Sequence, residues 1–454
     1  MGARTCSQIA RQLPLHGWDP IVLTVHEQYI ESAYLEQHRS LPDPHLTVIR
    51  TGKLLHPLSI YRWLNSLRQD ETAQHSDSTM KSSELSQDEK GFLRRQALSL
   101  LSTPDMHTGW IFPAILAGRR AIRRSQAEHI FSSGPYWTAH LIGYALARLT
   151  DLPWTAHFRD PWFTGAEAKK MTEVWPRLDA ALERMVVKRA DAVVCVTEAH
   201  TALLRQKYRE FPAEKFTTIS NGFDNSEWIS LPSAIESIKQ KNDRFTITYA
   251  GQLYMNRSPL PLFRALRILI DAGEIVQEKV QIDLIGWCDL SEGQQVTEMI
   301  AENGLGDCVN ITGPRGRAET LERLIKSDLL LLLAEDLTMQ IPGKTFEYLK
   351  AGRPILALTG EGAVAQLLRQ TGGGWVVNPA DEIGLQNALR ERYQQWLADE
   401  SGPVADPIVV AGFDRSILTG RLAKLFDHPG SLNQQNCPSA NQPEKYISSG
   451  ESAS

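Results

Sequence analysis

The chain has 454 residues, of which 42% are hydrophobic and 22% are charged, and its formal net charge is -5. This balance is typical of a soluble globular protein with two or three domains, and it provides no overall positive field to hold a nucleic acid. Five cysteines without a CxxC pair indicate neither a disulfide framework nor a zinc site and fit a reducing cytosol. No apolar run approaches the roughly 18 to 20 residues of a membrane-spanning helix, and the first residues lack the apolar core of a secretory signal. We therefore expect a cytoplasmic protein.

Short segments rich in apolar and β-branched residues recur along the chain and predict strands separated by helices. In the first half they are 20–25, 46–50, 128–133, 153–158, 191–196 and 215–220. In the second half they are 245–250, 280–285, 308–312, 328–333, 354–358 and 375–377. Several are apolar without alternation, as strands covered on both faces are. The pattern predicts an α/β protein with two Rossmann-like domains, each with one parallel sheet, facing a central cleft.

Composition also indicates where the domains end. We expect a first domain over residues 1–230, a second over 244–408 and a last helix over 409–428. Segments 70–90 and 429–454 have too few apolar residues to offset the entropy of ordering, so we expect them to be disordered. The chain opens directly on a helix-like stretch, where a parallel-sheet pattern calls for a strand and a glycine-rich turn. We therefore expect the native first strand to be missing.

The motif IPGK at residues 341–344 opens a helix shortly after a buried strand. Unpaired backbone donors and the helix dipole favour a phosphate at such a helix N-terminus. The donors here would be the N–H groups of Gly343, Lys344 and Thr345. One turn further, Glu347 is placed to accept hydrogen bonds from a ribose. The alternative is an ordinary helix start, with Lys344 in solvent and Glu347 on the surface.

A glycine and a cation, Gly251 and Arg257, follow the first strand of the second domain. Open α/β sheets bind ligands at this carboxyl end of their strands. A guanidinium there can clamp a diphosphate bidentately and neutralise the charge that develops on a leaving group. The alternative is an arginine that is simply solvated in a loop.

In the first domain, the strand 153–158 runs directly into a cluster of titratable residues, His157, Arg159 and Asp160. Charges at the carboxyl edge of a sheet need partners or a ligand, which makes these residues candidates for catalysis. Contacts that merely fix the loop are equally consistent with the pattern. The later pair Asn221 and Gly222 predicts a turn that serves as a structural hinge.

A basic and apolar helix is predicted from Trp110 to Arg124. It joins an apolar face to four arginines, Arg119, Arg120, Arg123 and Arg124. Such a helix can rest on anionic lipid headgroups, although a solvated basic surface is the commoner outcome. We therefore keep two alternatives for the location of the protein: fully cytoplasmic, or in peripheral contact with the inner membrane face.

Together these stretches resemble the family 4 glycosyltransferases of the GT-B fold, which are retaining enzymes that move a sugar from a nucleotide donor to an acceptor. The resemblance extends from Gly2 to about Phe426 and rests on GARTCSQIARQLPLHGWDPIVLTV, AHFRDPW, VCVTEAHTALLRQKY, TISNGFD, YAGQLYMNRSPLPLFRAL and IPGKTFEYLKAGRPILAL, in that order. It implies a nucleotide-diphosphate sugar as donor, a glycan or lipid-linked acceptor, and a role in surface polysaccharide biosynthesis. It implies no metal and no other cofactor.

In such enzymes, basic residues after the first strand of the second domain and amides of the glutamate-bearing helix hold the donor diphosphate. The resemblance assigns this role to Arg257, Gly343 and Lys344, and it assigns the ribose to Glu347. The leaving diphosphate oxygen accepts the proton of the acceptor on the same face, so the enzyme orients substrates and stabilises charge. His157, Arg159 and Asp160 would line the sugar and acceptor side, toward which domain closure brings the donor residues.

The chain departs from the family pattern at two positions. Gln252 replaces the usual arginine after the strand-end glycine, and Met339 replaces the first of two glutamates eight positions apart. The task of that first glutamate near the donor sugar then passes to backbone groups of the IPGK turn or is absent. Two other functions remain open: a UDP-sugar 2-epimerase, which is an isomerase with the same two-domain plan, and a non-catalytic protein that binds nucleotide sugars.

Overall fold

A computed structural model describes residues 2–30, 46–54, 103–162, 175–231, 242–254, 257–335 and 337–428. The two segments expected to be disordered, 70–90 and 429–454, lie outside the described residues. All twelve predicted strands occur, each within two residues of its expected bounds. In the part of the chain that the structure describes, no helix is both long and apolar enough to cross a bilayer.

The second domain is built on one six-stranded parallel sheet in the order β11-β8-β7-β12-β13-β14. The strands are β7 (Phe245–Ala250), β8 (Val280–Ile285), β11 (Val309–Gly313), β12 (Leu329–Leu333), β13 (Ile355–Leu358) and β14 (Gly374–Val377). Counted within the domain, this order is 3-2-1-4-5-6, the doubly wound Rossmann order. Strand order reverses between β7 and β12, so their carboxyl ends mark the switch point where such sheets bind ligands.

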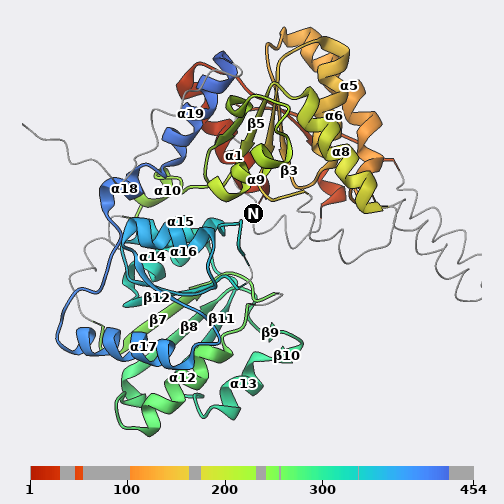
Figure 1. The fold of residues 1–454 in the computed structure, drawn as a ribbon. Helices are drawn as coiled ribbons and strands as arrows, with labels where there is room; N and C mark the ends of the chain where they lie inside the picture. The colour runs from red at the N-terminus through yellow and green to blue at the C-terminus, as the bar shows by residue number, and fades with distance from the viewer. Residues whose placement is uncertain are drawn as a thin grey trace, which may run out of the picture.

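Helices cover both faces of this sheet (Figure 1). They are α12 (Leu260–Asp271), α13 (Val296–Glu302), α14 (Arg317–Lys326), α15 (Gly343–Ala351), α16 (Ala363–Thr371) and α17 (Glu382–Leu397). A short antiparallel pair, β9 (Leu290–Ser291) and β10 (Gln294–Gln295), precedes α13. The sequence pattern did not indicate this pair, because two residues are too few to establish a period.

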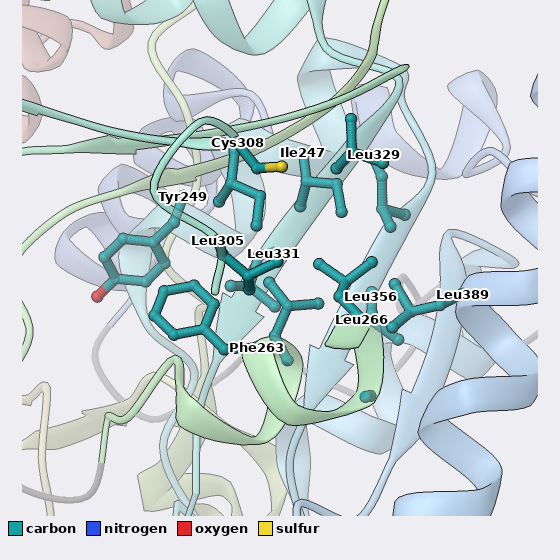
Figure 2. Packing of buried hydrophobic residues seen from close by; sticks show 14 of the residues in the cluster. Ile247, Tyr249, Phe263, Leu266, Leu305, Cys308, Leu329, Leu331, Leu356 and Leu389 are labelled. Atoms are coloured by element: carbon teal, nitrogen blue, oxygen red, sulfur yellow. The ribbon is translucent and has the colours of Figure 1, made fainter. Parts of the chain in front are cut away.

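The five leucines of β12 show why the central strands lack polar alternation. Every one of them is buried, and they alternate between the two cores. Leu329, Leu331 and Leu333 join the core between the sheet and helices α12 and α17. Leu330 and Leu332 join the core on the other face, between the sheet and helices α14, α15 and α16. Figure 2 shows the first of these cores, in which strand side chains gather with those of the two helices. Because successive side chains point to opposite faces, both faces of this strand must be apolar.

The first domain contains two parallel sheets, β1-β2 and β3-β4-β5-β6. Their strands are β1 (Ile21–Val25), β2 (Thr47–Thr51), β3 (Ile130–Gly134), β4 (Trp154–Phe158), β5 (Ala192–Cys195) and β6 (Phe216–Thr218). The single sheet expected for this domain is thus divided, because among the described residues no strand hydrogen-bonds to both β1 and β3. Helix packing still joins the two sheets: a Cβ on Gly118 would lie 2.8 Å from Leu146 and 3.3 Å from Leu23.

The helices of the first domain are α1 (Gly2–Gln12), α5 (Ile111–Ser125), α6 (Thr138–Thr150), α8 (Trp175–Arg189), α9 (Glu198–Lys207) and α10 (Ser226–Ile229). Single turns of 3-10 helix lie in this domain at Leu13–His16, Glu27–Tyr29, Thr108–Trp110 and Ala213–Lys215, and one lies in the second domain at Gln277–Lys279. After α17 the chain forms α18 (Pro407–Ala411) and α19 (Arg415–Asp427). Helix α19 returns to the first domain, where it packs against α1 (Figure 1). The first domain therefore contains residues from both ends of the described chain.

Candidate functional site

The structure brings Gly251 and Lys344 into contact at the switch point of the second sheet. Gly251 follows β7, and Lys344 is the second residue of α15. A Cβ on Gly251 would lie 2.5 Å from the Lys344 Nζ, and the φ of Gly251 is 145°, which side-chain-bearing residues rarely adopt. Glycine is therefore required at position 251 for two reasons: the backbone has a positive φ, and the Lys344 side chain occupies the space that a Cβ would need.

The Lys344 amine lies in the interior of the protein. The residue is 4% exposed, and within the described residues its Nζ lacks any hydrogen bond. The Nζ lies 3.8 Å from the centroid of the Tyr249 ring, as in a cation–π contact. Burial, followed by the charge of Arg257, lowers the pKa of Lys344 to about 7. The alternative of a solvated Lys344 is therefore wrong, and an anion beside this amine would offset the cost of its burial.

Arg257 provides a second cation at the same place. It lies in the loop after β7, half-buried, with its guanidinium carbon 4.1 Å from the centroid of the Tyr254 ring. Its charge is close enough to lower the pKa of Lys344. The two cations lie near the N-terminus of α15, whose dipole adds to their positive field. Such a group is complementary to a diphosphate.

The expected set of backbone donors at this helix N-terminus needs one correction. The amide of Thr345 donates to the carbonyl oxygen of Pro342 over 2.9 Å and so is not open to a ligand. Gly343 and Lys344 begin the helix, and N–H groups in the first turn have no intrahelical acceptor. The Thr345 hydroxyl is buried and has no partner in the described part of the chain. Its role in donor binding remains a prediction.

Glu347 is held by two arginines rather than exposed at the surface. Arg317 of α14 donates to both carboxylate oxygens over 2.9 and 2.8 Å, and Arg4 of α1 donates to Oε1 over 3.0 Å. Burial would raise the pKa of Glu347, but the charges of Arg317 and Arg4 outweigh it and lower that pKa below its usual value. The side chain is only 16% exposed, so the surface alternative is wrong.

The same two arginines also bind Glu227 of α10. Arg4 Nη2 lies 2.6 Å from Glu227 Oε2, and Arg317 Nε lies 2.9 Å from the same oxygen. Two arginines and two glutamates thus form one cluster between the first helix of the chain and the second domain. Sequence reasoning missed Arg4 and Arg317, because 343 residues separate Arg4 from Glu347 and no local pattern marks their contact.

His157 lies inside β4 and is 5% exposed. Its Nδ1 lies 3.1 Å from the Ser133 hydroxyl of β3. Burial, followed by the charges of Arg159, Arg415 and His140, lowers the pKa of His157 well below its usual value, so the ring is neutral at physiological pH. With Arg415 and Thr419 of α19 it lines a small cavity. A role for His157 on the sugar side remains a prediction.

Arg159 and Asp160 point to different partners. The Arg159 amide donates to Gly134 O over 3.0 Å and its guanidinium donates to Pro135 O, so it ties the loop after β4 to the loop after β3. Asp160 Oδ1 instead accepts a hydrogen bond of 2.8 Å from Gln340 Nε2 in the second domain. Burial raises the pKa of Asp160, and Arg159 and Gln340 oppose that rise.

A second bond joins the domains beside the first. The Thr197 hydroxyl, after β5, donates to the carbonyl oxygen of Met339 over 2.6 Å. It also caps α9 by accepting from the His200 amide over 3.3 Å. The capping role was foreseeable from a threonine before a helix. The contact with Met339 was not, because it depends on how the two domains pack.

Two family models match successive parts of the chain. Residues 2–222 match a glycosyl transferase 4-like domain, and residues 244–395 match glycosyl transferases group 1. The chain is a group 1 glycosyltransferase. The matches leave out the segment between the two domains, where the sequence predicted a connection. The predicted enzyme class is therefore confirmed.

Solved structures share the two-domain GT-B fold of this glycosyltransferase. HepE of Anabaena in complex with UDP-glucose aligns with a TM-score of 0.57 at 15% identity, over 94% of this chain and 96% of that chain. WaaG, a glycosyltransferase involved in lipopolysaccharide biosynthesis, gives 0.56 at 14% identity, over 94% and 95%. Sucrose-phosphate synthase of Thermosynechococcus elongatus gives 0.54 at 16% identity, over 92% and 86%. No curated protein matched the sequence. The predicted fold is confirmed.

Proposed function

We propose that this glycosyltransferase transfers a sugar, with retention of anomeric configuration, from a nucleotide-diphosphate sugar to a glycan or lipid-linked acceptor of a surface polysaccharide. The observation that carries the proposal is the buried amine of Lys344, which has no hydrogen-bond partner among the described residues and lies beside Arg257 at the N-terminus of α15. Similar folds support it, since HepE was crystallised with UDP-glucose and WaaG is involved in lipopolysaccharide biosynthesis.

The proposed site stabilises the leaving group rather than attacking the sugar. The bond from the sugar C1 to the diphosphate breaks, and a bond from C1 to the acceptor oxygen forms on the same face. The acceptor proton moves to the departing diphosphate oxygen. Lys344, Arg257 and the first amides of α15 stabilise the negative charge that grows on the diphosphate. Gly251 lets the lysine amine reach that position, and no metal or other cofactor is proposed.

The first domain would hold the sugar and the acceptor. The loop that carries Arg159 and Asp160 lies at the carboxyl end of β4, and its Asp160 contacts Gln340 in the loop that leads into α15. An ionised carboxylate beside the sugar would stabilise the positive charge of an oxocarbenium-like transition state. Glu347 would accept the ribose hydroxyls after one of its guanidinium partners moves.

A lipid-linked acceptor would require the enzyme to work at a membrane face. Helix α5 exposes Phe112 and Leu116, which are 62% and 41% accessible, and then four exposed arginines. No acidic residue interrupts Ile111–Ser125. We infer that this helix rests on anionic lipid headgroups, with the two apolar side chains entering the interface.

Calorimetric titration of UDP, UDP-glucose, GDP and uridine tests the donor site. We expect the diphosphates to bind and uridine to bind far more weakly, and we expect Lys344→Met to weaken UDP binding by about tenfold or more. Lys350→Met is the matched control, because Lys350 lies on the same helix but contacts the Phe223 ring instead. A chain that binds no nucleoside diphosphate, or a Lys344→Met variant that binds like the wild type, would refute the proposal.

Turnover distinguishes the remaining functions. Nucleotide sugars are incubated with and without glycan and lipid-linked acceptors, and products are identified by NMR. Release of nucleoside diphosphate together with an α- or β-linked product that keeps the donor configuration supports retaining transfer. Interconversion of the sugar without an acceptor would indicate the epimerase. Binding without turnover of any donor would indicate the non-catalytic binding protein.

A further inference from the structure

Two adjacent residues of the second domain are held by the first domain. Met339 and Gln340 lie in the loop between β12 and α15, directly before the IPGK turn. Thr197 binds the Met339 carbonyl oxygen over 2.6 Å, and Asp160 accepts from the Gln340 side chain over 2.8 Å. Thr197 follows β5 and Asp160 follows β4, so neighbouring strands of one sheet hold neighbouring residues of the other domain.

The position of this loop relates Asp160 to the proposed reaction. Gln340 precedes Gly343 by three residues and Lys344 by four, so the loop lies at the entrance to the proposed diphosphate site. The sugar of a bound donor extends from the diphosphate, and positive charge develops on that sugar during transfer. Position 339, a methionine, cannot supply a carboxylate there. Glu347, on the same helix as Lys344, has its charge balanced by Arg4 and Arg317.

We propose that Asp160 supplies the carboxylate facing the donor sugar from the first domain, and that Gln340 is the positioning residue that orients it. The inference rests on the proposed function. The Gln340 amide donates to Oδ1, which leaves Oδ2 to face the sugar. Transfer needs no proton from Asp160, which remains an ionised group that stabilises the oxocarbenium-like transition state.

The surroundings of Asp160 make its ionisation depend on Gln340. Burial disfavours the charged form, whereas the charge of Arg159 on its own loop and the N–H of Gln340 from the second domain favour it. Thr197, the neighbouring contact across the domains, is neutral. Removing the Gln340 donor therefore raises the pKa of Asp160, and the ionised fraction at a given pH falls.

The test is the pH dependence of UDP-glucose turnover by the wild type, Gln340→Leu and Gln340→Glu. We expect kcat to fall about 10- to 100-fold in Gln340→Leu, with KM and the Kd of UDP unchanged. The acid limb of the kcat profile should move to higher pH in Gln340→Leu and further in Gln340→Glu, where a second carboxylate faces Asp160. A purely structural role of Gln340 would not shift the acid limb further in Gln340→Glu than in Gln340→Leu. Gln340→Glu also keeps the shape of the side chain, so the test stands if Gln340→Leu folds poorly.

A double-mutant cycle completes the test. Asp160→Asn should lower kcat strongly. Adding Gln340→Leu to this variant should not lower kcat further, because the side chain that Gln340 orients is already neutral. An active wild type with unchanged profiles in the Gln340 variants, or a further loss in the double variant, overturns this inference and leaves donor binding intact. A wild type that neither binds UDP nor turns over UDP-glucose overturns the proposed function and this inference with it.

Discussion

Arg4 of α1 donates a hydrogen bond from Nη1 to Oε1 of Glu347 in α15 over 3.0 Å, and so connects the first domain to the helix of the proposed donor site. Arg317 donates to Oε1 as well as to Oε2 of the same carboxylate. A carboxylate oxygen offers about two acceptor sites, so Oε1 is fully occupied. A ribose that binds both oxygens of Glu347 must therefore displace an arginine, and Arg4 is the one that belongs to the other domain.

The first prediction is that Arg4→Ala tightens the binding of UDP by about three- to tenfold. The variant removes a charge-assisted hydrogen bond that competes with the ribose hydroxyls. Arg4→Lys keeps the charge and should bind UDP nearly as the wild type does. Calorimetry with both variants measures the difference. Unchanged or weaker binding by Arg4→Ala would mean that the ribose does not compete with Arg4 for Glu347.

The second prediction concerns protons taken up on donor binding. The pKa of Lys344 is lowered to about 7, so its amine is mostly neutral at pH 8. A diphosphate beside it favours the charged form and raises that pKa. Binding at pH 8 should therefore take up about one proton, and affinity should be highest below pH 7 and fall as pH rises above 7. Calorimetry in buffers of different ionisation enthalpy measures the uptake, which Lys344→Met should abolish.

The third prediction separates the two roles of Thr197. Thr197→Val removes both the cap of α9 and the bond to the Met339 carbonyl. It should lower the free energy of unfolding by about 1 to 2 kcal/mol and reduce kcat, because the loop of Met339 and Gln340 loses an anchor. Thr197→Ser keeps the hydroxyl and should restore both quantities. Urea denaturation and steady-state kinetics measure them, and a Thr197→Val variant with unchanged kcat would exclude the anchoring role.

The fourth prediction tests α5 as the membrane contact. Replacing Arg123 and Arg124 by glutamine should weaken binding to vesicles with anionic lipid about 30-fold at low ionic strength, at about 1 kcal/mol for each charge. Arg148 and Arg209, which are also exposed, give a charge-matched control when both are replaced by glutamine. Co-sedimentation with anionic and neutral vesicles measures the binding. Equal losses in the two double variants would indicate a general charge effect rather than contact through α5.

The sequence by itself determined the strands, the fold class and the enzyme family. A segment such as Leu329–Leu333 can be assigned without tertiary information, because a strand with both faces covered must be apolar at every position. The family resemblance that the sequence carries also implied that Arg257 and Lys344 hold the donor diphosphate together, whereas the contact of Lys344 with Gly251 became visible only in the structure.

Only the tertiary structure decided the partners of these residues. The burial of Lys344, the pairing of Glu347 with Arg4 across 343 positions, and the bond from Gln340 to Asp160 leave no local pattern in the chain. Each of them depends on where whole helices and domains come to rest against one another. Packing of that kind is set by the summed burial of many side chains, so which charged groups finally meet cannot be inferred from the residues near them in sequence.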